Sequence, residues 1–121
     1  MAGRRCEFTK LAEADLAEIA LYIAADNPNA ALRVVDELRT HCRLLTEFPA
    51  RNPLREQYGA GVRVAVHGRY LIFYAASDLT VVIERIVHSS RHPDWYGAVA
   101  FAAAWGSGPL RTYSPPVPRN R

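Results

Sequence analysis

The chain holds few of the residues that build disulfide frameworks. Only two of its 121 residues are cysteines, Cys6 and Cys42, and neither stands in a CxxC or Cys/His ligand spacing. Two cysteines form at most one bridge, and buried free cysteine is common in proteins from reducing compartments. We therefore expect both cysteines to be core residues.

Long apolar runs are also lacking. No stretch approaches the roughly 20 consecutive apolar residues of a membrane helix. Residues 1–8, MAGRRCEF, hold a basic pair with no apolar run behind it that would make a signal peptide. We expect a cytoplasmic protein without membrane contact. Because 50% of its residues are hydrophobic, the chain is long enough for one domain with a modest core.

The common motifs of catalysis and cofactor binding are absent from the sequence. There is no GxGxxG and no GxxxxGK phosphate loop. His88 and His92 are four residues apart, but they fall in a strand-to-loop region where no helix brings them together on a metal. A set of Ser89 or Ser90, His88 and Asp94 lacks the nucleophile elbow of a Ser-His-Asp hydrolase. We expect no metal and no cofactor.

Lysine is scarce, because arginine supplies 14 of the 15 cationic side chains. The planar fork of arginine suits phosphate and carboxylate recognition, although a GC-rich genome produces the same bias. Residues 1–50 carry six cations and eight acidic side chains, residues 51–98 six and four, and residues 99–121 three and none. The basic excess therefore lies in the C-terminal half.

Apolar residues recur at helical spacing in the first half of the chain. The pattern predicts an amphipathic helix over residues 10–26, with Thr9 as its N-cap, and a second helix over residues 28–47. Asn27 either ends the first helix or caps the second, where Pro28 suits the first helical position. The short connection predicts that the two helices are antiparallel neighbours.

The apolar period changes to two in the second half. After a loop at residues 48–61, the sequence predicts strands at residues 62–66, 69–75 and 80–88, joined by short turns. Such turns make the three strands an antiparallel meander. With a short strand at residues 5–8, the predicted fold is α+β in the order β-α-α-β-β-β, an antiparallel helical hairpin packed on one face of a small antiparallel sheet.

The end of the chain has a different composition. Residues 94–105, DWYGAVAFAAAW, predict a short helix that docks two tryptophans and an alanine-rich face. Residues 106–121 predict a disordered, Pro-rich tail. We divide the chain into a domain at residues 1–98 and an Ala/Pro-rich extension at residues 99–121, which we expect to be partly disordered.

Candidate functional residues lie on the sheet face that the hairpin is expected to leave open. Arg63 and His67 point together, opposite the valines of their strand. The last strand ends at His88, with Arg91 just beyond it. If the strands are adjacent, Arg63, His88 and Arg91 form a small cationic patch with an imidazole that titrates near neutral pH. Arg85 is expected to pair with a carboxylate or backbone carbonyls in a structural role.

Four segments stand out by their order and spacing. They are the helical stretch DLAEI..YIA.DNP.AA, the G.R of Gly61 and Arg63, the GRY.I.Y from Gly68 to Tyr74, and the R.VH..R from Arg85 to Arg91. In this order they resemble the ParE branch of the RelE/ParE toxin superfamily, from bacterial type II toxin-antitoxin modules. The resemblance covers residues 8–92.

The resemblance implies a partner and a target as well as the fold. A cognate antitoxin would neutralise the toxin by wrapping an initially disordered segment around it. DNA gyrase would be the target, inhibited without a bond-breaking step by the toxin, and no direct contact with nucleic acid is expected. The residues expected at the target surface are Arg63, His88, Arg91 and His92. Tyr70 and Tyr74 are expected to be core residues or antitoxin contacts.

Two alternatives stay open. The RelE branch shares the fold and cuts mRNA in the ribosome, which requires a base, cations over the scissile phosphate and a donor for the leaving oxygen. Arg63 and Arg91 match two cations of that branch and Tyr96 lies near its tyrosine, but other strand cations are missing. The second alternative is a degenerate member that binds antitoxin without toxicity. It is suggested by His92, where many relatives have aspartate, and by the longer Ala-rich end.

Overall fold

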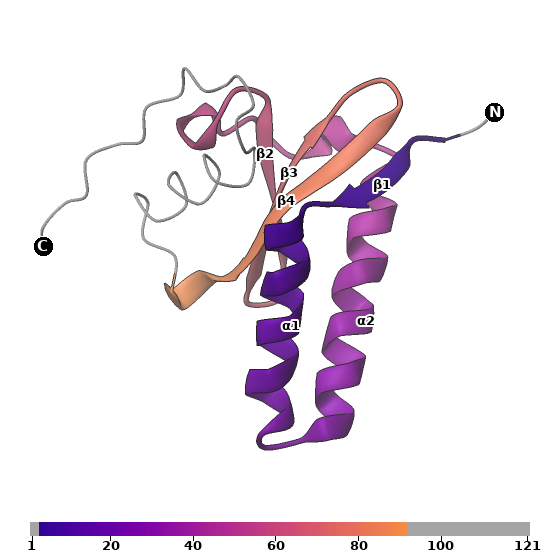
Figure 1. The fold of residues 1–121 in the computed structure, drawn as a ribbon. Helices are drawn as coiled ribbons and strands as arrows, with labels where there is room; N and C mark the ends of the chain where they lie inside the picture. The colour runs from indigo at the N-terminus through magenta and orange to yellow at the C-terminus, as the bar shows by residue number, and fades with distance from the viewer. Residues whose placement is uncertain (1–2, 92–121) are drawn as a thin grey trace, which may run out of the picture.

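Two antiparallel helices lie side by side across one face of a four-stranded sheet (Figure 1). The computed structural model describes residues 3–91. The elements are β1 (Arg5–Phe8), α1 (Lys10–Ala24), α2 (Pro28–Leu44), β2 (Val62–His67), β3 (Tyr70–Ala76) and β4 (Thr80–His88), with short 3-10 helices η1 (Pro49–Arg51), η2 (Glu56–Tyr58) and η3 (Ser89–Arg91). The predicted element order and helical hairpin are confirmed. The interpretations of residues 92–121, including the helix at 94–105 and the boundary after residue 98, lie outside the described residues.

Side chains fix where the two helices begin. Thr9 Oγ1 accepts the N–H of Ala12 at 3.0 Å, and Asn27 Oδ1 accepts the N–H of Ala30 at 3.1 Å. Each helix start therefore has a capping oxygen for one of its unbonded amides. The Asn27 N–H also donates to the carbonyl of Ile23 at 2.8 Å. One residue thus both ends α1 and starts α2, which explains the short connection.

The sheet is mixed, because β1 runs parallel to its neighbour. Strands β2, β3 and β4 form the predicted antiparallel meander, and the sheet order is β1-β4-β3-β2. β1 pairs with β4 in parallel, with Arg5 opposite Thr80 and Phe8 opposite Ile83. The hairpin and two strands lie between them in the sequence and provide the long connection that a parallel pair needs. The expectation of a wholly antiparallel sheet is therefore corrected at β1.

A β-bulge in β4 sets which of its side chains meet the helices. Residues 73–74 of β3 pair with Arg85 and Ile83, so Glu84 is the extra residue of β4. One extra residue reverses the alternation of side chains beyond it. Ile83 and Ile86, three positions apart, consequently both belong to the core beneath the helices.

The main core lies between the helices and the sheet. Cys42 is buried in it and Cys6 packs half-buried against it, both as free thiols, as the sequence predicts. The buried side chains of this core are Ala12, Leu16, Ile19, Leu38, Cys42, Leu45, Ala65, Ile72, Tyr74, Val81, Ile83 and Ile86.

The sheet face predicted to be open is the one that the helices cover. Ala65 is buried beneath the hairpin, and His67 meets His41 of α2 at 2.9 Å. The face shared by Arg63, Ala65 and His67 therefore looks toward the helices, while the valines of β2 contribute to a second, smaller core on the other face. The prediction was wrong because it assigned polar strand residues to solvent, whereas α2 and the loop after it supply them with partners.

A buried ion pair joins α1 to the edge of β4. Asp15 accepts two hydrogen bonds from the Arg85 guanidinium, both at 2.7 Å, and a third from the Ile86 N–H at 2.9 Å. β1 pairs with β4 only as far as Ile83. Asp15 therefore takes the place of the next strand in satisfying an edge amide. The predicted structural role of Arg85 is confirmed.

We expect Asp15→Asn to lower the free energy of unfolding by about 3–5 kcal/mol, because it removes the carboxylate charge that pairs with the buried Arg85 guanidinium through two hydrogen bonds. The Arg85 and Asp15 side chains are only 8% and 9% exposed. Urea unfolding followed by circular dichroism measures the loss. In the control variant Glu7→Gln, the broken pair with Arg5 has side chains 52% and 67% exposed, so the loss should not exceed about 1 kcal/mol. Equal losses in the two variants would contradict the expectation.

Candidate functional site

Three aromatic rings form a row across one end of the sheet. His67 of β2 pairs with Tyr70 of β3, and Tyr70 pairs with His88 of β4. The rings of Tyr70 and His88 meet edge to face, with centroids 5.3 Å apart. We call these three residues the ring row. Each of its histidines lines a cavity beside the helical hairpin.

His88 is held by the backbone that follows it. Its Nδ1 accepts the N–H of Ser90 at 3.2 Å and lies 2.8 Å from Ser90 Oγ. A neutral His88 ring therefore carries its proton on Nε2, which becomes the donor for a partner. The Ser89 N–H donates to the carbonyl of Arg69 at 2.7 Å. This bond fixes η3 against the turn between β2 and β3.

The first cavity, about 540 Å³, lies between α1 and the end of β4, and we call it the α1 cavity. Leu21 and Tyr22 in its lining are 73% and 75% exposed. Exposed apolar side chains beside a carboxylate and an imidazole suit an amphipathic protein segment. The lining residues are Asp15, Glu18, Ile19, Leu21, Tyr22, Arg85, Ile86, Val87 and His88.

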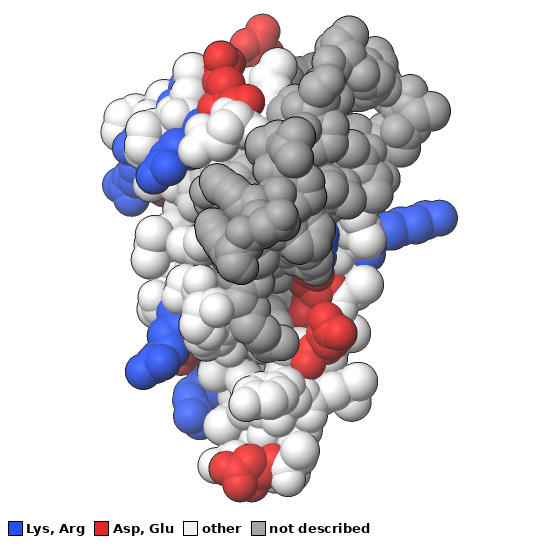
Figure 2. Space-filling view, turned by 90° about the vertical axis from the view of Figure 1, so that its left-hand side faces the viewer, with Lys and Arg blue, Asp and Glu red and all other residues white. Residues whose placement is uncertain are grey.

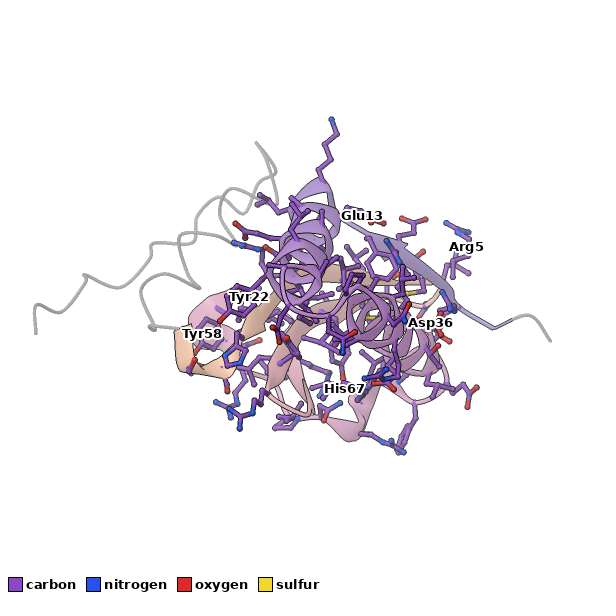
Figure 3. All side chains as sticks on the ribbon, turned by 90° about the horizontal axis from the view of Figure 1, so that it is seen from below. Arg5, Glu13, Tyr22, Asp36, Tyr58 and His67 are labelled. Carbon is purple, nitrogen blue, oxygen red and sulfur yellow. The ribbon has the colours of Figure 1, made fainter. Side chains whose placement is uncertain are left out.

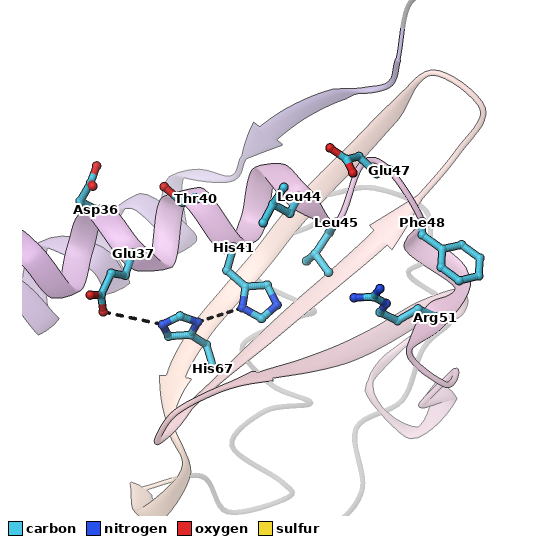
Figure 4. A pocket seen from close by; sticks show the side chains of 10 residues that line it. All are labelled: Asp36, Glu37, Thr40, His41, Leu44, Leu45, Glu47, Phe48, Arg51 and His67. Atoms are coloured by element: carbon cyan, nitrogen blue, oxygen red, sulfur yellow. Dashed lines mark hydrogen bonds and ion pairs between the residues drawn. The ribbon is translucent and has the colours of Figure 1, made fainter.

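The second cavity, about 570 Å³, lies between α2, η1 and the end of β2, and we call it the α2 cavity (Figure 4). His41 and His67 meet in it with their Nδ1 atoms 2.9 Å apart. Glu37 Oε1 lies 4.0 Å from His67 Nε2. Figure 3 shows Tyr22, of the α1 cavity, and His67 at different sides of the hairpin. The lining residues are Asp36, Glu37, Thr40, His41, Leu44, Leu45, Glu47, Phe48, Arg51 and His67.

The two histidines of the α2 cavity can keep their contact only if one ring donates an N–H to the lone pair of the other. Its short Nδ1–Nδ1 distance requires an N–H on one ring and a lone pair on the other, so at least one ring is neutral. Burial lowers the pKa of His41, and the neighbouring His67 and Arg51 lower it further. Two cationic rings at this distance repel each other, so acidification opposes the contact between α2 and β2.

No sequence motif marks this pair, and it was not predicted from the sequence. His41 and His67 are 26 residues apart, and only the packing of α2 over the end of β2 brings them together. The one available signal was the i,i+4 spacing of Glu37 and His41, which places an acid and an imidazole on the same helix face.

Arg63 does not join His88. Its Nη1 donates to the carbonyl of Asn52 at 2.6 Å, and in the register it stands opposite Tyr74, whereas the ring row lies four residues further along β2. At about 3.3 Å per residue this is a separation of roughly 13 Å along the strand. The predicted cationic patch is therefore wrong in its placement of Arg63.

The two tyrosines of β3 have different surroundings. Tyr74 is fully buried, and its hydroxyl donates to the carbonyl of Pro49 at 2.6 Å and accepts from Asn52 Nδ2 at 3.0 Å. Tyr74 is thus a core residue, which is one of the two roles expected for it, because none of its side chain reaches the surface. Tyr70 is half-buried in the ring row.

Three predicted site residues lie at or beyond the end of the described chain. The backbone of Arg91 closes η3, while its side chain is outside the description. His92 and Tyr96 are outside the described residues altogether.

The described residues hold no cluster of metal ligands, and their buried cysteine is unreactive. Within residues 3–91, no group of three or more His, Cys, Asp or Glu side chains would hold a metal ion. Burial raises the pKa of Cys42 to about 12, so its thiol stays protonated and is no nucleophile. In the same part of the chain, no helix has the length and apolar character to cross a membrane. On the face drawn in Figure 2, the described Lys and Arg side chains lie mainly along the left-hand side, and the Asp and Glu side chains lie at the top, the middle right and the bottom.

Comparison with known proteins points to one family. The sequence model of the ParE toxin of the type II toxin-antitoxin system, parDE, matches residues 6–93. The solved chromosomal ParDE system from P. aeruginosa is similar in fold, with 22% identity and a TM-score of 0.60 over 70% of this chain and 95% of that chain. The RelBE2 toxin-antitoxin complex from Mycobacterium tuberculosis is 27% identical, with a TM-score of 0.56 over 73% and 93%. No curated protein sequence matches the chain.

We expect the protein to lose stability as the pH falls below about 6.5. The pKa of His41 is lower in the folded protein than its ordinary value of 6.5. The unfolded chain therefore binds the proton first, so stability is greatest above that ordinary pKa and falls with acidification. Urea unfolding at about pH 7.5 and about pH 5.5 measures the change. His41→Gln should reduce the pH dependence, while Leu32→Gln, on an exposed part of α2, should leave it as in the parent. An equal dependence in His41→Gln and the parent would contradict this.

Proposed function

The chain belongs to the ParE toxin family of type II toxin-antitoxin systems, and we propose that it inhibits DNA gyrase and is neutralised by direct binding of a cognate antitoxin. One observation carries the proposal: the family match runs over residues 6–93 and so includes the whole hairpin, the meander, the ring row and both cavities. In this proposal the toxin acts in the cytoplasm, without a cofactor and without direct contact to nucleic acid.

We place the antitoxin contact at the α1 cavity. Leu21 and Tyr22 offer exposed apolar surface there, and Glu18 and His88 offer charge and hydrogen bonding beside it. An initially disordered segment gains affinity by burying such apolar side chains, which offsets the entropy lost on ordering. Tyr70 supports this surface from behind, because its half-buried ring meets His88 edge to face. The two similar solved structures are both described as toxin-antitoxin systems or complexes, which supports a protein partner of this kind.

We place the gyrase contact at the end of β4, on His88 and on Arg91 and His92, which follow it by three and four residues. Hydrogen bonds from Ser90 hold the His88 ring with Nε2 as its donor. Arg63 is left out of this surface, because its guanidinium is bonded to the Asn52 carbonyl further along the sheet.

The position of Arg63 also supports a non-enzymatic toxin over a ribonuclease. A ribonuclease of the RelE kind would need Arg63, Arg91 and Tyr96 to converge on one phosphate. Arg63 lies four residues along β2 from the ring row, while Arg91 follows the strand that ends in the ring row. The similarity to RelBE2 is the observation that keeps mRNA cleavage as the second candidate.

A pair of assays on one antitoxin-free preparation decides between the candidates. We expect inhibition of gyrase supercoiling with accumulation of cleaved DNA, and intact mRNA in a parallel translation reaction whose mRNA ends are mapped. Ribosome-dependent cuts with fully active gyrase would instead establish the ribonuclease. Activity of both systems in the presence of the protein would identify a degenerate member that only binds its antitoxin.

We expect His88→Gln to weaken gyrase inhibition by at least about tenfold, or about 1.4 kcal/mol, because it removes the ring that lies at the centre of the proposed contact. The concentration of toxin that halves supercoiling measures the effect. Leu79→Ala is the control, since Leu79 is 69% exposed in the turn at the opposite end of β4. Equal inhibition by His88→Gln and the parent would remove His88 from the target surface.

A separate substitution tests antitoxin binding. The product of the neighbouring reading frame, where antitoxins of such modules are usually encoded, should copurify with the toxin. Tyr22→Asp should weaken that complex by at least about tenfold, because it places a charge in exposed apolar surface next to Glu18. Calorimetric titration measures the change, with Leu79→Asp as the matched control. An unchanged affinity for Tyr22→Asp would move the antitoxin away from the α1 cavity.

A further inference from the structure

The second face of the sheet is apolar although neither helix covers it. The helices pack on the face of Ala65 and Ile72. The opposite face presents valine, leucine and phenylalanine side chains from three strands; Arg85 of β4 stands opposite Phe73 in the register, but its guanidinium is bonded to Asp15 of α1. We call this opposite face the second face; its residues are Val62, Val64 and Val66 of β2, Leu71 and Phe73 of β3, and Val87 of β4. An antiparallel sheet with one solvated face ordinarily carries polar side chains there. The composition of the second face therefore indicates that it is covered.

The side chains of the second face are buried at one end and become more exposed toward the ring row. The η2 helix closes one end, where Tyr58 meets Phe73 edge to face with ring centroids 5.0 Å apart, and Val62 is fully buried. Toward the ring row the apolar surface continues, with Leu71 and Val87 half-buried and Val66 62% exposed. Val66 and Leu71 are paired neighbours on β2 and β3. The surface beyond η2 is thus a continuous apolar patch at the end of the sheet where the described chain stops.

We propose that residues 94–105 of this same chain, DWYGAVAFAAAW, pack on the second face beyond η2. Ten of these twelve residues are hydrophobic and one is charged, a composition that matches the face and suits burial. The described chain reaches Arg91 four residues after Val87, so the segment begins beside the patch. Adjacent strands lie about 4.8 Å apart, so the patch from β4 to β2 is roughly 10 Å wide, within reach of twelve residues even as a helix of about 18 Å.

Residues 94–105 are favoured over a second copy of the protein as the occupant of the second face, because they are covalently attached to the end of β4. A segment tethered by two residues is present at the face at an effective concentration in the millimolar range. A second copy at micromolar concentration would have to overcome a far larger loss of translational entropy for the same contact. The contact we propose is independent of the toxin's target and places residues 94–105 with the folded domain.

The chain offers a direct probe, because its two tryptophans, Trp95 and Trp105, both lie in this segment. We expect the full-length protein to show tryptophan emission at a shorter wavelength than the urea-unfolded chain, and acrylamide quenching at least about twofold weaker than in that chain. These signals should be constant over about a hundredfold range of protein concentration, since an intramolecular contact does not depend on concentration.

Val66→Glu tests the face itself. Val66 is exposed on an edge strand, so the variant should keep its far-ultraviolet circular dichroism while it places a charge under the segment. We expect its tryptophan emission to move to longer wavelength and its quenching to rise at least about twofold. Leu79→Glu, also exposed and at the other end of the sheet, should leave both signals as in the parent.

Three results would overturn the proposal. Quenching of the native protein equal to that of the unfolded chain would show a segment in solvent. Emission that shifts with protein concentration would assign the face to a second copy. Protected tryptophans that do not respond to Val66→Glu in a folded variant would place the segment somewhere else on the molecule.

Discussion

The structure depends on the way α1 closes the edge of β4. β1 covers that edge only to Ile83, and beyond it the chain entering α1 takes over. The Thr9 N–H donates to the Ile83 carbonyl at 3.1 Å and its hydroxyl donates to the Glu84 carbonyl at 2.9 Å, while Asp15 accepts the Ile86 N–H. A helix start thus continues the hydrogen bonding of a strand, and the hairpin is fixed relative to the strand that carries the ring row.

This connection explains how a small domain keeps a binding surface in place. The Asp15–Arg85 pair forms one wall of the α1 cavity, so the bonds that hold α1 on the sheet also shape the cavity next to His88. On the other side of the hairpin, the contact between His41 and His67 links α2 to the end of β2. The ring row lies between these two attachments, on strands whose positions are fixed from both sides.

The sequence predicted the elements well because their signals are local. Helical and alternating periods located both helices and the meander, and Asn27 marked the junction that it caps. The faces of the strands were not predicted, because β2 carries apolar residues on one face and on the other Ala65 between polar ones. Arg63 and His67 look solvent-exposed in the sequence, and they face the helices because Asn52 and His41 provide their partners.

Contacts between residues that are far apart along the chain could not be predicted from the sequence. Arg85 was recognised as paired because a cation within an apolar strand needs a counter-charge, yet nothing in the sequence singled out Asp15 among the acidic residues of its helix. The parallel direction of β1 and the histidine pair follow from register and helix packing, and neither has a local pattern.

The bulge at Glu84 has a consequence for how such a chain tolerates insertion and deletion. Side chains alternate along a strand, so the bulge exchanges the two faces of everything that follows it. Loss of Glu84 itself would leave a regular ladder, with Arg85 directly after Ile83 and with Ile86 and His88 still toward the helices. Loss of one residue beyond the bulge, such as Ile86, would instead turn Val87 toward the helices and His88 away from them. Beyond the bulge of β4, a gain or loss of one residue would therefore be harder to accommodate than most substitutions, whereas loss of a residue at Glu84 would keep every pair of the ladder.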